Sequence, residues 1–371
     1  MSSATTTNSQ DPAEKAIQDF ARITGVNEAL AHFFLQDFDF QLERGLNAYY
    51  RQMEKEEDKT ETSADDDDDD ENDDDDGNDS DVMIIEDDDP MEVDDTETKV
   101  TTSQESNPAT STKQPNTKDD KFPDDITLVT YNVDGLDTGN LRTRFQGVVH
   151  IIAKINPEII LLQEVVDEHM EVINEVIAPM YHVITPLNKG MPYYTVTLVS
   201  KNILSRTMEC KPFTNTSMGR TMTVFEGYWQ KLRLVVIHSH LESMREHAQA
   251  RKAQFSECMK KMESNLDAET LVIFAGDLNI RDSELPMIHP QIKDAWIAAG
   301  RDKATQYTWD NMKNSNKGLP NNVRYRFDRV YFNGPYKKID FTLAGTQQIR
   351  KVMCYPSDHF AVVCKFWDPV N

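Results

Sequence analysis

Six short clusters of carboxylate, amide and imidazole side chains lie beside apolar runs in the C-terminal two-thirds of the chain. Because strand ends from distant parts of a chain can meet at one edge of a sheet, side chains at such positions can build a single site. A set of oxygen ligands without thiolates suits Mg²⁺ or Mn²⁺ and counts against zinc. With histidines and amides added, it is equipped to hydrolyse phosphoesters. The clusters are, in chain order, Asn132-Val133-Asp134, Gln163-Glu164, His238-Ser239-His240, Asp277-Leu278-Asn279, Asp328-Arg329 and Ser357-Asp358-His359.

Each cluster has an ordinary structural explanation when it is taken alone. A Gly-Asp-x-Asn such as 276–279 is usually a turn in which Asp and Asn bind their own backbone. A single histidine such as His240 or His359 is more often a structural residue. Six clusters in order, on six apolar runs, favour a shared site instead.

The apolar runs beside these clusters are short enough to be strands, and they alternate with a few helical patterns. The runs span 126–131, 159–162, 195–199, 232–238, 271–275, 327–332 and 361–366, and helices are predicted over 145–155 and 245–266. This pattern predicts an α+β fold, a two-sheet sandwich flanked by helices. The segment 311–325, with Asn, Lys, Gly and Pro spread through it, is typical of a loop.

Charge divides the chain into three parts. Residues 1–120 contain 36 acidic and 9 basic side chains, whereas the remaining 251 residues contain 28 and 30. The net charge of −25 therefore does not exclude a polyanionic ligand for the C-terminal part. Between Glu61 and Glu97 there are 22 acids and no Lys or Arg, which predicts disorder. We expect a three-helix bundle at 12–52, a disordered acidic linker at 53–121 and a catalytic domain at 122–371.

The expected bundle at 12–52 has apolar residues at helical spacing in three short stretches. It resembles a ubiquitin-associated (UBA) domain, with Gly25 in the first loop and the pair Phe34-Leu35 in the second helix. The resemblance implies ubiquitin as a partner. The alternative is that these apolar residues only form the core of the bundle.

One apolar segment interrupts the acidic linker. The run Val82-Met83-Ile84-Ile85 is followed by four acids at 86–89. A β-branched run with an acidic flank can add a strand to a basic-edged sheet, as SUMO-interacting motifs do. SUMO is therefore a second expected partner, and a chance run within an acidic linker is the alternative.

Several classes of protein are excluded by simple patterns. No apolar run approaches the ~18–20 residues that span a bilayer, so we expect no membrane partner. The N-terminal MSSATTTNSQ lacks the basic and apolar regions of a secretory signal. The four cysteines (Cys210, Cys258, Cys354 and Cys364) form no C-x-x-C pair, which predicts neither a disulfide framework nor a zinc site.

Residues 126–367 resemble the endonuclease/exonuclease/phosphatase superfamily. Its order of motifs, Asn … Gln-Glu … His … Gly-Asp-x-Asn … Ser-Asp-His, is present at 132, 163–164, 240, 276–279 and 357–359. Three further blocks resemble the branch that removes topoisomerase tyrosines from DNA 5′ ends. They are Ser-His-Leu-Glu-Ser at 239–243, Tyr-Thr-Trp-Asp at 307–310 and Arg-Phe-Asp-Arg at 326–329. The resemblance implies hydrolysis of the 5′-phosphotyrosyl bond during double-strand break repair, and hence a nuclear location, with the cytoplasm as a further possibility.

The resemblance also implies roles for the residues around the reacting phosphorus. Glu164 is expected to bind Mg²⁺ directly, with Mn²⁺ as a substitute, and Asp134 to act through the hydration shell of the ion. Asp277 is expected to position and deprotonate the attacking water, and Asn279 to orient water and phosphate.

A second group is expected to stabilise charge on the phosphoryl oxygens. His359, oriented by Asp358, is expected to carry most of this role, with Asn132 and His240 nearby.

Binding of the DNA and its adduct needs phosphate contacts and stacking platforms. The expected substrate-binding residues are Ser243, Arg220, Arg245, Arg281, Tyr193, Trp309 and Phe327. A solvated arginine or an aromatic residue in the core is the ordinary alternative for each, most seriously for Phe327, which starts an apolar run.

Two other functions remain open from the sequence. Abasic-site endonucleases share Asn-Val-Asp-Gly-Leu and Gly-Asp-Leu-Asn, but they place a catalytic Tyr where this chain has 239–243. A catalytically inactive scaffold that binds ubiquitin or SUMO would need a broken ligand set. None of Asn132, Glu164, Asp277, Asn279 and His359 is missing.

Overall fold

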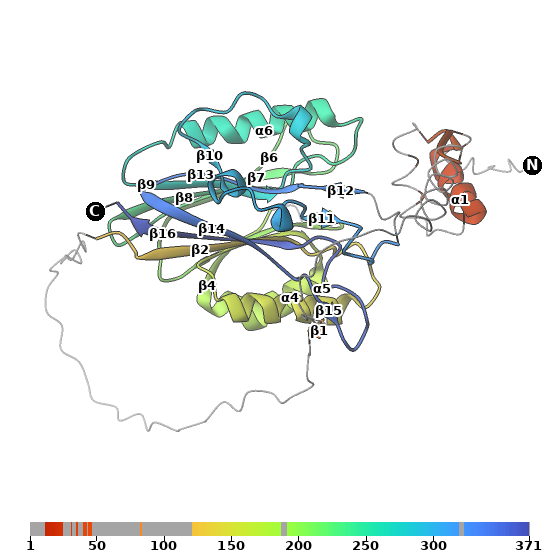
Figure 1. Cartoon of the computed structure of the whole chain (residues 1–371), viewed down its shortest axis with the longest axis horizontal. Coiled ribbons are helices and arrows are strands. Elements are labelled where there is room, and N and C mark those ends of the chain that lie inside the picture. The colour runs from red at the N-terminus through yellow and green to blue at the C-terminus, as the bar shows by residue number, and fades with distance from the viewer. Residues whose placement is uncertain are drawn as a thin grey trace, which may run out of the picture.

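The computed structural model describes residues 12–24, 31, 35, 40–42, 44–46, 82–83, 121–186, 191–318 and 323–370. From residue 121 onward, two six-stranded sheets pack face to face, with helices on their outer faces (Figure 1). This is the expected two-sheet sandwich. One sheet has the order β14 (Tyr336–Ala344), β16 (Ala361–Pro369), β2 (Asp125–Asn132), β3 (Ile159–Val165), β5 (Tyr194–Ser200) and β4 (Tyr181–Ile184). The other has the order β10 (Lys293–Asp294), β13 (Asp328–Asn333), β9 (Thr270–Asp277), β8 (Leu232–Ser239), β7 (Thr221–Trp229) and β6 (Leu204–Pro212).

The central strands are apolar on both faces because each is covered on both sides. In β8, Leu234 and Val236 point into the core between the sheets. Val235 and Ile237 alternate with them and pack in the outer core with α6 (Ala248–Glu263). Successive side chains of a strand point to opposite faces, which produces this division. The near-continuous apolar runs of the sequence are therefore the expected signature of strands buried on both sides.

The opposite sheet is built in the same way. Its outer face is covered by α4 (Leu141–Ile155), whose Phe145 and Val148 pack in one core cluster with Val129 and Leu162. Two pairs of neighbouring strands, β2–β3 and β8–β9, are parallel. Parallel strands end at the same edge of a sheet, and β9 packs against β2 and β3 of the opposite sheet, so the polar clusters at the ends of these three strands lie together.

The predicted strands and helices are present with small differences at their ends. The helix expected over 245–266 spans Ala248–Glu263, and Phe327 lies just before β13 rather than in it. Strands β4, β6, β7 and β14 were not predicted, because polar residues interrupt the apolar ones along each of them. The remaining elements are short: α5 (Asp167–Val172), α7 (Ala295–Ala298), β11 (Trp309–Asp310), β12 (Arg324–Tyr325), a π-helical turn (Ile173–Ile177) and 3₁₀ turns (Ala178–Met180, Asp282–Glu284, Lys303–Thr305).

The N-terminal region is described only in part. Helix α1 (Pro12–Thr24) buries Phe20 against Leu35, with Ala16 and Ala31 completing a small core. Phe34 and most of the expected second and third helices lie outside the described residues. Within the described part of the chain, no helix is long and apolar enough to cross a membrane.

One short segment of the expected linker is described. Strand β1 (Val82–Met83) pairs in parallel with β15 (Gln348–Ile349) of the catalytic domain. The rest of 53–120 lies outside the described residues, so the expected disorder of the linker stays a prediction.

Candidate active site

Four of the expected catalytic and metal-binding residues converge at the edge where β2, β3 and β9 end. The Asn132 amide Nδ2 donates to Glu164 Oε1 at 3.1 Å and to Asp277 Oδ2 at 3.0 Å. His359 Nε2 lies 3.8 Å from the same Asp277 oxygen. The Asn132 amide therefore bridges two carboxylates that lie 113 positions apart in the sequence, and the His359 imidazole lies beside one of them, that of Asp277.

The backbone at this edge is shaped to present these side chains. Glu164 and Asn279 have left-handed backbone conformations, with φ of 56° and 49°. Glu164 also lies where the β3–β5 ladder shifts its register, between Leu162 and Val165. Gly276 has a φ of 144°, and a Cβ there would lie 1.9 Å from the Ser239 carbonyl oxygen. Left-handed conformations of non-glycine residues concentrate at functional sites. The positive φ of Gly276 and its close approach to Ser239 explain why the Gly-Asp-Leu-Asn turn needs its glycine.

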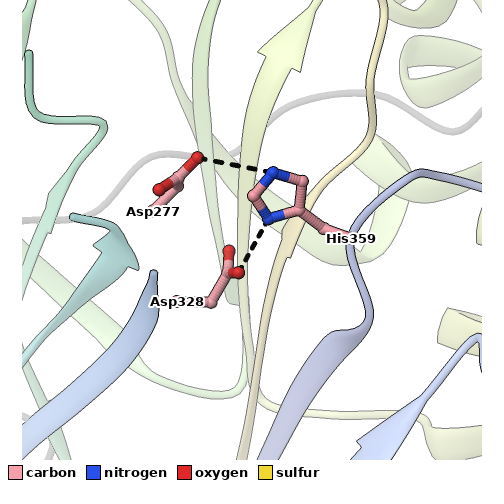
Figure 2. Close-up of side chains that lie close together, drawn as sticks. All are labelled: Asp277, Asp328 and His359. Atoms are coloured by element: carbon pink, nitrogen blue, oxygen red, sulfur yellow. Dashed lines mark hydrogen bonds and ion pairs between the residues drawn. The ribbon is translucent and has the colours of Figure 1, made fainter. Parts of the chain in front are cut away.

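His359 is oriented by Asp328, not by Asp358. Figure 2 shows the imidazole between Asp277 and Asp328, and its Nδ1 lies 2.8 Å from Asp328 Oδ2. The Asp358 carboxylate instead accepts from the Trp309 indole Nε1 at 3.1 Å. The expectation that Asp358 orients His359 was therefore wrong, although Asp358 still acts on the imidazole through its charge.

The environment of His359 favours its charged form. Burial by itself would lower the pKa of the imidazole, but the carboxylates of Asp328, Asp358 and Asp277 raise that pKa well above its ordinary value. His359 is therefore an imidazolium at neutral pH. Its Nδ1 proton is donated to Asp328, which leaves Nε2 as a donor on the side of Asp277.

His240 has the opposite charge state. Arg220 Nη1 lies 2.9 Å from His240 Nδ1, and since a guanidinium can only donate, Nδ1 is the acceptor. Burial, reinforced by the charge of Arg220, lowers the pKa of His240 well below its usual range. The neutral ring thus carries its proton on Nε2, which lies 3.4 Å from Asp277 Oδ2. Arg220 also lies over the Tyr193 ring, 5.2 Å from its centroid.

The carboxylates of this centre are hard to ionise. Burial and the neighbouring charge of Asp328 raise the pKa of Asp277 to about 7. Burial and Asp358 likewise raise the pKa of Glu164. A raised carboxylate pKa near the working pH is the property that a general base needs.

Asp134 has partners that the sequence did not indicate. Lys317 Nζ lies 2.8 and 2.9 Å from the two carboxylate oxygens of Asp134, and Arg144 Nη1 lies 3.4 Å from one of them. Both oxygens therefore face cations of the protein. Burial, followed by the charge of Asp358, nevertheless raises the pKa of Asp134 to about 8.

Two of the three aromatic residues expected to bind the DNA 5′ end, Trp309 and Phe327, lie in a group of three rings, whereas Tyr193 lies beside His240 and Arg220. Trp309 and Phe327 are both buried, with ring centroids 6.0 Å apart. Tyr325, which the sequence analysis did not select, is half-buried and stacks on Phe327 at 4.7 Å. The guanidinium of Arg281 lies over the Tyr325 ring at 5.5 Å. The accessible part of the platform is therefore Tyr325 with Arg281.

The other expected substrate-binding residues lie in the loop that follows β8. The Ser243 hydroxyl contacts Met218 Sδ at 3.1 Å, and Arg245 is exposed at the start of α6. Asn279 belongs to the centre itself, since its backbone N–H donates to Asp277 Oδ1 at 3.1 Å. Tyr193 and Arg220 lie together beside His240, whose Nε2 is 3.4 Å from Asp277 Oδ2.

Two sets of residues could hold a metal ion. Asp277, Asp328 and His359 offer ligand atoms within 4.8 Å of one another. An imidazolium bonded to Asp328 cannot donate a lone pair to a metal, however, so His359 would first have to lose a proton. Glu164 fits better: its carboxylate is half-buried, and Asn132 is its single hydrogen-bond donor among the described residues. A carboxylate oxygen beside an amide suits a hard divalent cation.

Two functional candidates, Tyr325 and Lys317, escaped the sequence analysis, and a third, Asp328, was named among the polar clusters but was given no role. A signal existed for Asp328, since a carboxylate in an apolar strand run must find a partner when it is buried. Tyr325 lies two residues before Phe327, so it shares a face with it if the segment is extended. Lys317 carried no local signal, because its partner Asp134 lies 183 positions away.

Comparison with known proteins identifies the relatives of this arrangement. Residues 129–359 match the endonuclease/exonuclease/phosphatase family, and residues 14–56 match the UBA-like domain. The 5′-tyrosyl-DNA phosphodiesterase of Caenorhabditis elegans is 35% identical over 97% of this chain and 89% of the relative. The crystal structure of tyrosyl-DNA phosphodiesterase 2 from C. elegans aligns with a TM-score of 0.64 and 32% identity, over 99% of this chain and 97% of the other. The D. rerio tyrosyl-DNA phosphodiesterase 2, solved with a single-strand DNA product, gives a TM-score of 0.61 and 28% identity over 66% and 99%.

Proposed function

We infer the reaction from the family to which the chain belongs, the endonuclease/exonuclease/phosphatase family in its tyrosyl-DNA phosphodiesterase 2 branch. The chain is a phosphodiesterase that hydrolyses the bond between a tyrosine and a DNA 5′ phosphate, and so acts in the repair of topoisomerase-linked DNA breaks. The observation that carries this function is the convergence of Asn132, Glu164, Asp277 and His359 around one point. The alternative of an inactive scaffold has no support in this geometry, since the centre is complete.

Asp277 acts as the general base. Its carboxylate takes a proton from the attacking water, the water oxygen forms a bond to phosphorus, and the bond from phosphorus to the tyrosine oxygen breaks. The amide of Asn132 and the backbone N–H of Asn279 hold the carboxylate in place. The products are a DNA 5′ phosphate and a free tyrosine side chain, with a phenolate whose pKa near ~10 makes it a moderate leaving group.

His359 stabilises the negative charge that develops on the phosphoryl oxygens. Its Nε2–H donor is fixed because Nδ1 is bonded to the buried carboxylate of Asp328. A donor that is already oriented before reaction does not need to reorganise in the transition state, and such groups typically contribute ~10²–10³ in rate.

We propose that the resident ion is Mg²⁺, with Mn²⁺ as a substitute, and that Glu164 holds it. A divalent ion there would supply positive charge to the phosphate. The oxygen donors at this edge support the proposal, as does the raised pKa of Glu164, which a bound cation would bring down.

The DNA and its protein adduct occupy different sides of Asp277 in this proposal. The stack of Trp309, Tyr325 and Phe327 receives the 5′ nucleotide, and Arg281 a backbone phosphate. Tyr193 and Arg220, which lie beside His240, face the tyrosine that leaves.

The test compares cleavage of a 5′-phosphotyrosyl oligonucleotide and of an abasic-site duplex, with and without Mg²⁺. We expect Mg²⁺-dependent release of tyrosine and a loss of ~10²–10³ in Asp277→Asn. Faster cleavage of the abasic duplex would favour an abasic-site endonuclease, and full turnover of Asp277→Asn would refute the assignment of the base.

We propose ubiquitin and SUMO as further partners, and the nucleus as the location. The UBA-like match over 14–56 supports ubiquitin binding. The pairing of β1 with β15 supports SUMO, because it is an example of Val82-Met83 adding as a strand to another sheet. Chemical-shift titration of the full chain with ubiquitin, and SUMO pull-down of an alanine block over 82–85, test the two partners separately.

A further inference from the structure

The carboxylate of Glu242 is fully buried three residues after the end of β8, and no step of the proposed reaction uses it. Its Oε1 accepts from the Thr216 hydroxyl at 2.7 Å and from the backbone N–H groups of Ser217 and Met218 at 2.6 and 3.2 Å. A buried carboxylate is tolerated when it is hydrogen-bonded in this way. The donors that Glu242 finds among the described residues therefore all come from one loop.

Glu242 is an anion in spite of its burial. Burial by itself would raise the pKa of the carboxyl, but the hydrogen bonds from the loop, followed by the charge of Arg220, lower that pKa below its ordinary value. Successive backbone N–H groups that converge on one oxygen form an anion-binding turn. The loop is thus folded around a negative charge at neutral pH.

The loop that Glu242 holds spans residues 213–220, connects β6 to β7 and ends in Arg220. The Thr216 hydroxyl that donates to Glu242 also accepts from the backbone N–H of Arg220 at 2.7 Å. Met218, whose N–H binds the same carboxylate, places its Sδ 3.6 Å from Arg220 Nη2. Glu242 is therefore linked to both the backbone and the side chain of Arg220 through one intervening residue in each case.

Arg220 is the side chain that this loop brings to the catalytic centre. Its Nη1 donates to His240 Nδ1 at 2.9 Å, and its guanidinium lies over the Tyr193 ring. On the other side of the imidazole, His240 Nε2 lies 3.4 Å from Asp277 Oδ2. Arg220 Nε is buried and has no hydrogen-bond partner among the described residues, so one N–H is left for a ligand. A displacement of Arg220 would therefore affect this ligand position and the surroundings of the general base.

Glu242 is itself fixed by helix α6. Its backbone N–H donates to Gln254 Oε1 at 3.0 Å, and its carbonyl oxygen accepts from Arg251 Nη1 at 2.9 Å. Arg251 is fully buried, and its Nη2 lies 2.7 Å from Glu284 Oε1. Connecting loops are ordinarily the more mobile parts of a domain, but this loop is tied through one carboxylate to a packed helix.

We propose that Glu242 is a positioning residue for the tyrosine side of the reaction, because it fixes the loop so that the Arg220 guanidinium is already held against His240 when the substrate binds. The inference rests on the proposed function, in which Arg220 faces the tyrosine that leaves. A group that is placed before the reaction does not need to reorganise in the transition state. Glu242 acts only through Arg220 and does not contact the reacting atoms.

The test is a ratio of two single-turnover rates, measured on the full-length chain with Mg²⁺. One substrate is an oligonucleotide with a 5′ phosphotyrosine, and the other is the same oligonucleotide with a 5′ p-nitrophenyl phosphate. The p-nitrophenolate spreads its charge over the nitro group and needs less help to leave than a tyrosine. In Glu242→Ala we expect a loss of ~10–100-fold with the tyrosine substrate, since a misplacement of about 1 Å can cost that much, and a clearly smaller loss with p-nitrophenolate. A smaller amount of folded protein would reduce both rates by the same factor.

A double-mutant cycle shows whether the effect passes through Arg220. When Arg220→Ala is already present, Glu242→Ala should reduce the phosphotyrosyl rate by less than ~2-fold, because the effects of residues that act through one another do not add. Thr216→Val removes the hydroxyl between the two residues and leaves the carboxylate in place, so it should change the ratio of rates in the same direction. If Glu242→Ala does not fold, Thr216→Val decides.

Asp310→Asn is the matched control. Asp310 is another buried carboxylate that accepts from the backbone of its own loop, at the N–H of Met312. Its replacement should leave the ratio of the two rates unchanged, whatever it does to the amount of folded protein.

No loss, or an equal loss with the two substrates, would overturn the inference, and so would a full additional loss in the Arg220→Ala background. In each case the wild type would still hydrolyse the phosphotyrosyl bond, so the proposed function would stand. A wild-type chain without turnover of the phosphotyrosyl oligonucleotide in Mg²⁺ or Mn²⁺ would remove the proposed function, and the inference with it.

Discussion

Replacing Asp328 by Asn should disable the active site by removing a charge rather than a contact. Asp328 is fully buried on β13, and its Oδ2 lies 2.8 Å from His359 Nδ1. Asparagine can present its amide oxygen at the same place and still accept the Nδ1 proton. The imidazole should therefore keep its position while it loses the main negative charge that favours its protonation.

The size of the effect follows from the geometry. Two unit charges about 4 Å apart attract each other by about 4 kcal/mol at an effective dielectric constant of about 20. In the wild type, burial alone would lower the pKa of His359, and the carboxylates overcome it. Without Asp328, burial acts against fewer negative charges, so the pKa of His359 falls and the ring loses its proton at a lower pH than in the wild type. The lost stabilisation of the transition state corresponds to ~10²–10³ in kcat.

The assay is single-turnover hydrolysis of a 5′-phosphotyrosyl oligonucleotide across a range of pH. In the wild type we expect activity to rise as Asp277 deprotonates, from a pKa of about 7 in the free protein, and to fall when His359 loses its proton. In Asp328→Asn the falling limb should move to lower pH, with KM nearly unchanged. Asp294→Asn is the matched control, because Asp294 forms a buried ion pair with Arg326, in the link between β12 and β13, away from His359.

Two results would refute this reasoning. If Asp328→Asn retained wild-type turnover with an unchanged falling limb, the charge of Asp328 would not matter to His359. If Asp294→Asn lost as much activity as Asp328→Asn, the loss would reflect the general cost of disturbing a buried carboxylate in this sheet.

Three further outcomes are expected. Burial lowers the pKa of His238 to about 3. Below about pH 6.5 the unfolded chain takes up a proton on this histidine and the folded chain does not, so the free energy of unfolding falls by ~1.4 kcal/mol per pH unit. Above about pH 6.5 this loss is absent. The destabilisation caused by His238→Gln, measured by urea unfolding, should therefore shrink by ~2 kcal/mol between about pH 6.5 and 5, whereas the exposed His150→Gln should show no such trend. Tyr325→Ala should weaken binding of a single-stranded 5′ end by ~1–3 kcal/mol, measured by fluorescence anisotropy, and Tyr228→Ala, an exposed tyrosine on β7, should not. Arg281→Ala should reduce the slope of log affinity against log salt by ~1, and an unchanged slope would show that this arginine contacts no phosphate.

The sheets and the acids of the site could be predicted from the sequence because both are local signals. A strand that is buried on both faces is an unbroken apolar run, and the acids of the centre stand at the ends of such runs. Asn132, Glu164 and Asp277 each lie at or next to the last residue of their strand, so locating the strand also locates the side chain. Strands β6, β7 and β14, which lie at or next to an edge of their sheets, lacked this signal because polar residues interrupt their apolar ones.

The partner of His359 could not be predicted in this way. Asp358 is its neighbour in the sequence, but the Asp358 carboxylate accepts from the Trp309 indole instead. Asp328 reaches His359 because β13 pairs with β9 in the register that sets Asp328 opposite Asp277. That register is decided by the packing of a whole strand, which no local motif encodes.

The positive charges of the centre were the hardest part to predict, and the reason is physical. Buried acids that follow strands need compensation, but any cation that can reach them will serve, so its place in the sequence is free. Arg144 comes from α4, Arg220 from the segment before β7, and Lys317 from a loop fastened by asparagines to the backbone of 355–357. Long flexible side chains let these cations approach from different directions. A sequence therefore shows where the negative charge of such a centre lies, whereas the structure is needed to show which cations balance it.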